Sequence, residues 1–108
     1  YYNNVFHFTR RKAIDIIKQL GKKYTNLPEA KQQKVKAEIQ TLAREVSYED
    51  LEPLFNTAAK KVGTRIAVAL TLQVLLENDL QRNEQIESFI GAAKTDAHPV
   101  LSEIAKQI

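Results

Sequence analysis

The sequence predicts an all-α fold, a compact bundle of five or six helices around a central apolar helix at about residues 65–77. Three observations support this. Glycine and proline number only three each, too few for the tight turns of a sandwich or barrel. Apolar residues recur at spacings of three and four along most of the chain. Nine of the eleven residues from Ile66 to Leu76 are apolar, so a helix there has to be enclosed by other helices.

The length of 108 residues suits one domain, and the 31 Val, Ile, Leu and Phe residues supply one core. We expect a single helical domain over residues 1–108, cut from a longer chain, since the sequence starts without Met and ends on an apolar residue. Cysteine is absent, which excludes disulfides and thiolate metal ligands. The lack of cysteine, together with the lack of a basic-then-apolar leader at the start, favours a soluble intracellular protein, cytoplasmic or nuclear.

The first helix has two alternative starts. Thr9 can cap it, or it begins earlier with Asn3 or Asn4 as the cap and Phe6 added to its apolar face. Lys22 and Lys23 suit the negative end of the helix. The expected inward positions are Ala13, Ile14, Ile16, Ile17, Leu20 and Tyr24.

The sequence Asn26-Leu27-Pro28-Glu29 predicts a second helix start, with Asn26 as the cap and proline in the first turn. This helix is expected to run to about Val46. Its inward positions are Val35, Ile39, Leu42, Ala43 and Val46, and the opposite face is polar.

Ser47 and Asp50 have the spacing of a capping box, with Asp in place of the usual Glu. Pro53 lies too far into the following segment for an undisturbed helix. Either a short turn precedes a helix starting at Pro53, or one helix is kinked there. The expected inner face is Leu51, Leu54, Phe55, Ala58 and Val62, after which Gly63 ends the helix and Thr64 caps the next.

The central helix is too short to cross a membrane, because eleven residues rise about 16 Å against a bilayer core of about 30 Å. Asn78 and Asp79 interrupt the pattern after it. Asn83 or Asp79 then caps a helix with Ile86, Phe89, Ile90 and Ala93 inward. Thr95, Asp96 and Pro99 signal a last helix, with Val100, Leu101, Ile104, Ala105 and Ile108 inward. We favour a bundle over a solenoid fragment, since a solenoid seldom encloses one helix on all sides.

No catalytic, metal or cofactor motif is present, so we expect a protein that is not an enzyme. His7 and His98 lack metal-ligand spacing, and no glycine-rich loop is available to bind phosphate. Ser47, Ser88 and Ser102 have no neighbouring base in the sequence. The carboxylate pair Glu49/Asp50 suits a helix start, and Glu84/Glu87 a solvated face.

Half of the aromatic residues lie within the first eight positions, namely Tyr1, Tyr2, Phe6 and Phe8. Aromatic side chains supply large contact areas at interfaces, although at a chain end they also pack over a core. We therefore expect a protein–protein interaction or scaffold module, whose partner-binding surface joins these aromatics to the exposed face of the first helix. A third hypothesis is a small helical inhibitor or immunity-type protein with one cognate target.

Charge is distributed unevenly along the chain. Residues 1–23 carry a balance of +5, whereas residues 66–108 carry −3. The alternative function is therefore binding of RNA, DNA or another polyanion through Arg10, Arg11, Lys12, Lys18, Lys22 and Lys23. A helix-turn-helix at Ala59, Val62, Gly63 and Thr64 is disfavoured, because the helix that follows offers few polar side chains to bases. An apolar stripe on the last helix would allow a homo-oligomer.

Overall fold

Six helices follow one another along the described residues, which are 2–55, 61–78 and 80–108, with side chains described from residue 13 onward. In this computed structural model they are α1 (Tyr2–Tyr24), α2 (Glu29–Ala43), α3 (Tyr48–Leu51), α5 (Val62–Glu77), α6 (Glu84–Lys94) and α7 (Pro99–Lys106). These ranges contain no strand. The predicted all-α class is confirmed.

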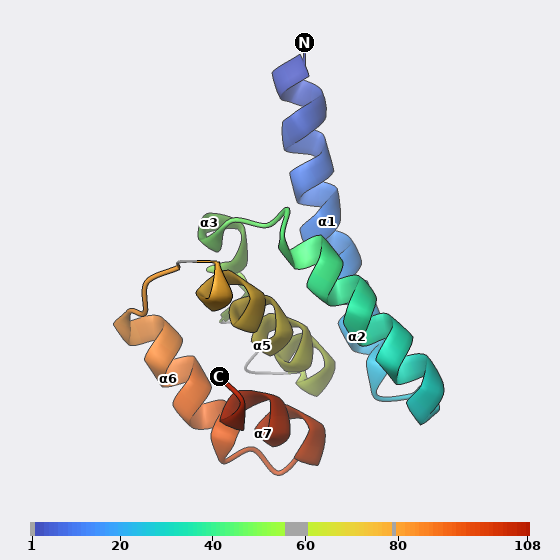
Figure 1. The fold of residues 1–108 in the computed structure, drawn as a ribbon, viewed down its shortest axis with the longest axis vertical. Coiled ribbons are helices and arrows are strands. Elements are labelled where there is room, and N and C mark those ends of the chain that lie inside the picture. The colour runs from blue at the N-terminus through green and yellow to red at the C-terminus, as the bar shows by residue number, and fades with distance from the viewer. Residues whose placement is uncertain (1, 56–60, 79) are drawn as a thin grey trace.

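Helix α5 is the centre of the bundle, as predicted. It contacts α1 and α2 on one side and α6 and α7 on the other (Figure 1). Ile66, Leu70 and Leu72 are fully buried, because helices surround α5 on most of its circumference. The Cα radius of gyration is 13.4 Å, close to the roughly 13 Å of a compact domain of about 100 residues, so the helices form a closed bundle.

The start of α5 differs from the prediction. Lys61 is its N-cap, so Gly63 lies inside the first turn instead of ending the preceding helix, and the buried Thr64 is not a cap. Val62 likewise belongs to α5. Tertiary packing accounts for the difference, since Gly63 faces Gly21 of α1 across a very close helix crossing.

A glycine is required on both sides of this crossing. A Cβ built on Gly63 would lie 2.5 Å from the carbonyl oxygen of Gly21, and one built on Gly21 would lie 2.7 Å from Cβ of Ala67. Both distances are below ordinary van der Waals contact. The two glycines thus let the backbones of α1 and α5 approach each other directly.

Helix α1 begins at Tyr2, so Thr9, Asn3 and Asn4 all lie within the helix and none is its cap. Of the expected inward residues, Ala13, Ile17 and Tyr24 are buried, and Ile14 and Leu20 are half-buried. Ile16 is 38% exposed, so its inward assignment is wrong. The inward line runs through the buried Gly21, on the side of α1 away from Ile16. The N-terminal half of α1 projects beyond the other helices (Figure 1).

Helix α2 has Pro28 as its N-cap, so the prediction of Asn26 as the cap is wrong. The connection from α1 is held instead by Gln32, whose side-chain amide donates to the carbonyl oxygen of Tyr24 at 2.9 Å. The helix ends at Ala43, three residues before the expected Val46. Its predicted inner face is confirmed, with Ile39, Ala43 and Val46 buried and Val35 and Leu42 half-buried.

The capping-box prediction at Ser47 is confirmed. The Asp50 carboxylate accepts hydrogen bonds from the backbone N–H and the hydroxyl of Ser47, at 3.3 and 3.1 Å. Of the two alternatives at Pro53, the short turn is correct, because α3 ends at Leu51 and helical structure resumes at Leu54. Leu51 and Leu54 are buried and Phe55 is half-buried, while Ala58 lies outside the described residues.

The last two helices begin where the sequence predicted. The Asn83 side chain caps α6 by accepting from the backbone N–H of Ile86 at 2.8 Å. Pro99 is in the first turn of α7, where His98 is the N-cap and its Nδ1 accepts from Val100 N–H at 3.3 Å. The inward faces are confirmed, with Ile86, Ile90, Ala93, Leu101, Ile104 and Ala105 buried and Phe89, Val100 and Ile108 half-buried.

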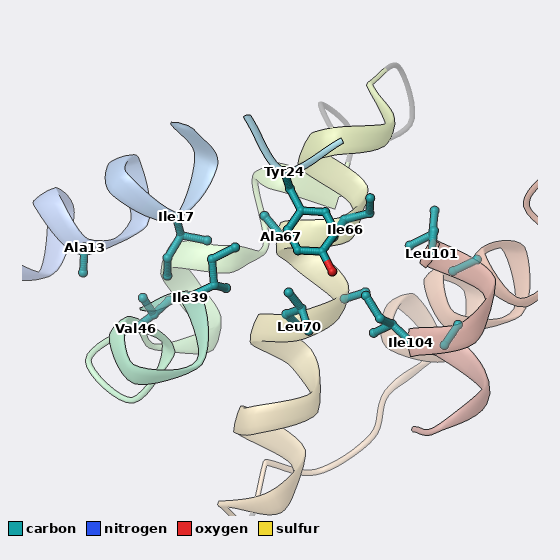
Figure 2. Packing of buried hydrophobic residues seen from close by; sticks show 13 residues of the cluster. Ala13, Ile17, Tyr24, Ile39, Val46, Ile66, Ala67, Leu70, Leu101 and Ile104 are labelled. Atoms are coloured by element: carbon teal, nitrogen blue, oxygen red, sulfur yellow. The ribbon is translucent and has the colours of Figure 1, made fainter. Parts of the chain in front are cut away.

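The core has two parts that meet on α5. The larger part joins α1, α2, α5 and α7, and Figure 2 shows Ile17, Ile39, Leu70 and Leu101 within it. Tyr24 belongs to this part, and its burial raises the pKa of the phenol above the ordinary value. The smaller part joins α3, α5 and α6 around residues such as Leu72 and Ile86. A groove opens along the edge of this smaller part.

Candidate functional site

The described residues form a surface groove of about 750 Å³ between the α3 region and α6. One wall is built from α3 and the segment that follows it, with Glu49, Glu52, Pro53 and Phe55. The other wall is the face of α6 that carries Glu84, Gln85, Ser88, Phe89, Ala92 and Ala93. Arg65 of α5 and Asp96 complete the lining. The volume is within the range of about 300–1,000 Å³ that is usual for ligand sites.

Aromatic rings form an apolar surface in this groove. The ring centroids of Phe55 and Phe89 are 5.5 Å apart with planes tilted by 41°, and Tyr48 packs on Phe55 at 6.0 Å. Both separations fall in the favourable range for aromatic pairs. Phe55 and Phe89 are half-buried, so each ring packs on the smaller core and still lines the groove.

A polar network ties α3 to the start of α6. The Tyr48 hydroxyl donates to Oε1 of Gln85 at 3.1 Å and accepts from Nδ2 of Asn83 at 3.0 Å. Asn83 uses its other side-chain atom to cap α6. One asparagine therefore both starts α6 and fixes its first turn beside α3.

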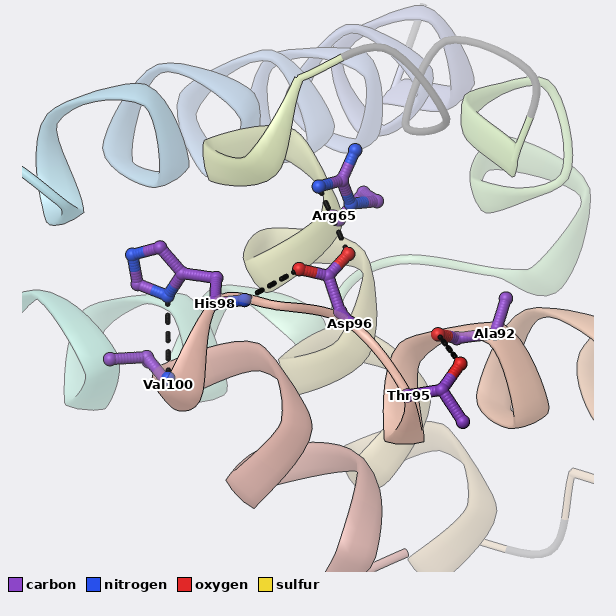
Figure 3. Close-up of polar contacts among 6 residues, drawn as sticks. All are labelled: Arg65, Ala92, Thr95, Asp96, His98 and Val100. Carbon is purple, nitrogen blue, oxygen red and sulfur yellow. Dashed lines mark hydrogen bonds and ion pairs between the residues drawn. The ribbon is translucent and has the colours of Figure 1, made fainter.

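An ion pair ties α5 to the end of α6. Arg65 Nη2 of α5 lies 3.0 Å from Oδ2 of Asp96, in the connection between α6 and α7 (Figure 3). The other oxygen of Asp96 accepts from the backbone N–H of His98 at 2.9 Å. Both side chains of the pair are about one-fifth exposed, so the contact is partly shielded from solvent. The two ends of α6 are thus each held by polar side chains.

The remaining charges along the groove are acidic. Glu49 and Glu52 are exposed on one wall and Glu84 is exposed on the other. Arg65 is the cation among the described lining residues, and its guanidinium lies against Asp96. The groove therefore presents an aromatic surface between negatively charged edges.

The structure describes the side chains of only some of the predicted N-terminal site residues. The side chains of Tyr1, Tyr2, Phe6, Phe8, Arg10, Arg11 and Lys12 lie outside the described part of the structure. Lys22 and Lys23 are exposed and Lys18 is half-buried. Within the described residues no carboxylate is within 4 Å of these three ammonium groups, whereas Arg65 and Arg82 form ion pairs with Asp96 and Glu87.

The segment at which a helix-turn-helix was disfavoured from the sequence belongs in part to the enclosed helix α5. Val62, Gly63 and Thr64 lie in its first turn, and Ala59 lies outside the described residues. Since α5 is enclosed by neighbouring helices, it cannot enter a DNA groove.

Among the described residues, no cluster of three or more His, Asp or Glu side chains has an arrangement that would bind a metal ion. No helix in that part of the chain combines the length and apolar character needed to span a bilayer. The expectations of no enzyme activity and no cofactor stay predictions from the sequence.

Sequence reasoning missed the groove. It assigned Phe55 and Phe89 correctly to inward faces, but helical periodicity does not distinguish the centre of a core from its edge. The available signal was acidic residues near both phenylalanines, in segments more than thirty residues apart. Comparison of this chain with protein-family models, with curated proteins and with solved structures found no match.

Proposed function

We propose that the chain is a protein-interaction module that holds a segment of another protein in the groove between the α3 region and α6. The observation that carries this proposal is the aromatic surface of Phe55 and Phe89 in a groove of about 750 Å³. Aromatic side chains in such clefts bury large areas on binding and commonly supply most of the binding energy. A helical inhibitor with one cognate target would be a special case.

The walls of the groove are suited to this role because packed helices and polar contacts position them. Leu51 and Leu54 anchor the α3 wall in the core, and Ile86 and Ile90 anchor the α6 wall. The Tyr48 and Asp96 contacts then fix both ends of α6. A preformed groove supports binding, since little conformational entropy is lost when the partner docks.

Site-specific photo-crosslinking tests the proposal. A photoreactive amino acid at Ser88, an exposed lining residue, should capture a partner protein in cells that produce the chain. The matched control is the same amino acid at Ala37, which is exposed on α2 and remote from the groove lining. Nuclease treatment separates direct capture from bridging by nucleic acid. Capture that is equal at both positions, or absent at Ser88, would contradict the proposal.

A second candidate function, polyanion binding, is favoured by the exposure of Lys22 and Lys23 without a neighbouring described carboxylate. Phosphate contacts make the log of the affinity fall with the log of salt concentration, by about 0.7–0.9 for each phosphate neutralised. Replacing both lysines with Gln should therefore weaken oligonucleotide binding and reduce this slope. The control replaces Lys31 and Lys34, both exposed on α2. Binding that is insensitive to salt would exclude this function.

A further inference from the structure

The geometry points to a basic amphipathic helix as the segment that the groove binds. This inference rests on the proposed function and specifies the chemistry of the partner. The partner helix would place apolar side chains on the aromatic surface of Phe55 and Phe89. Its Lys or Arg side chains would flank these anchors and meet the carboxylates at both edges.

The length of the groove fits two turns of a helix. The lining residues of α6 run from Glu84 to Ala93, which corresponds to about 14 Å along a helix axis. Apolar anchors at positions i and i+7 of a partner helix are about 10 Å apart, so both fit within this length. Two anchors separated by one further helical turn would be about 16 Å apart and would extend past the end of the α6 wall. The groove is therefore expected to hold two or three apolar anchors.

The charges of the groove determine which sign of charge the partner helix should carry. Glu49, Glu52 and Glu84 are exposed on opposite walls, so cationic side chains on both sides of a docked helix would have a carboxylate within reach. An acidic helix would face like charges on both sides. Arg65 pairs with Asp96, so these two charges balance each other and the three glutamates give the described lining its net negative charge. Complementary charges of this kind raise association rates and select among partners.

The probe is a labelled synthetic helix of about 14 residues, made of Lys with Leu at alternating spacings of three and four. Two control peptides contain Glu in place of Lys, or the same Lys and Leu residues in a scrambled order. Fluorescence anisotropy with the full chain should show the tightest binding for the ordered Leu/Lys peptide, weakening between about 50 and 300 mM salt. Equal binding of the scrambled or the acidic peptide would overturn the inference.

Two sets of variants locate the binding. The Glu49→Gln, Glu52→Gln, Glu84→Gln triple variant should bind the Leu/Lys peptide roughly tenfold more weakly, as expected for the loss of three exposed charge pairs. The control triple variant neutralises Glu38, Glu45 and Glu103, which are exposed outside the groove lining. Both variants have the same net charge, so equal affinities would mean non-specific attraction and would refute the proposed site.

Ala92→Gln tests the shape of the groove without a change of charge. Ala92 lines the groove, is exposed, and lies on a helix that tolerates Gln, so the domain should remain folded while the longer side chain reduces binding. Unchanged peptide affinity in a folded Ala92→Gln protein would overturn the inference. If the free protein were a dimer and Ala92→Gln made it monomeric, the occupant of the groove would be a second copy of the chain. That result would also overturn the inference.

The outcomes separate this inference from the function on which it rests. A captured partner whose bound segment is not a basic helix would refute the helix chemistry and leave the interaction module standing. No groove-specific capture at Ser88 would refute the module itself.

Discussion

Replacing Gly21 with Ala should destabilise the domain, although alanine is the better helix former. The added Cβ would lie 2.7 Å from Cβ of Ala67 and closer still to the carbonyl oxygen of Gly63. Ordinary contact begins near 3.4 Å, so α1 and α5 have to separate by on the order of 1 Å. A backbone oxygen within a helix cannot rotate away as a flexible side chain can.

The expected loss follows from this separation. Overpacking of a well-packed interface costs about 1–3 kcal/mol, and a radial gap of 0.5–1 Å removes about a quarter to a half of the dispersion energy of each separated contact. Gly91→Ala is the matched control, since its Cβ would meet no atom within 4 Å and the position is exposed in α6. That control should gain about 0.5–1 kcal/mol from helix propensity. The two variants have the same composition and share the gain in helix propensity, so they should differ by the overpacking cost of about 1–3 kcal/mol.

Urea unfolding followed by circular dichroism measures both free energies of unfolding. In a thermal scan each kcal/mol corresponds to roughly 4–8 °C for a domain of this size. The Gly21→Ala, Gly63→Ala double variant should lose less than the sum of the two single variants, because the helices are already separated after the first substitution. The prediction would be refuted if the Gly21→Ala and Gly91→Ala proteins were both as stable as wild type. That result would show that α1 and α5 do not cross at these glycines.

Four further predictions concern the core, the ion pair and the N-terminal surface. Leu70→Ala should lower the free energy of unfolding by about 2–5 kcal/mol, since the side chain is fully buried; a loss under about 0.5 would contradict that burial. Tyr24→Phe should reduce the alkaline loss of stability, because a pKa raised in the folded state makes stability fall as pH rises above the unfolded value of about 10; identical profiles would refute this. Asp96→Asn should cost about 1–3 kcal/mol in urea unfolding by removing one partner of the partly buried ion pair, and an unchanged midpoint would contradict it. Replacing Phe6 and Phe8 with Ser should weaken partner capture with helicity intact, as the sequence predicts for a binding surface; loss of helicity would contradict this prediction.

Local patterns predicted the features that local physics determines. The capping box at Ser47, the Asn83 cap and the His98–Pro99 start each depend on residues within one helical turn. The enclosed position of α5 was also predictable, since its apolar side chains leave no polar face for solvent.

Features decided by tertiary contacts could not be predicted in this way. Gly63 resembled a helix end because glycine usually occupies that position, but its role here depends on Gly21, forty-two residues earlier. Ile16 has the spacing of a core residue and is nevertheless exposed, because α5 approaches α1 on the side of Gly21. The sequence alone does not indicate which two glycines face each other across a helix crossing.

The same packing explains why a groove lies where it does. The glycine crossing brings α1 directly against α5, and the larger core fills the space among α1, α2, α5 and α7. Helix α6 packs mainly on α7 and has less contact with α5. Its face toward α3 is therefore only partly covered, with Phe55 and Phe89 at the edge of the smaller core. The polar contacts at Tyr48 and Asp96 position the two ends of α6, and the partly covered face between them forms the groove.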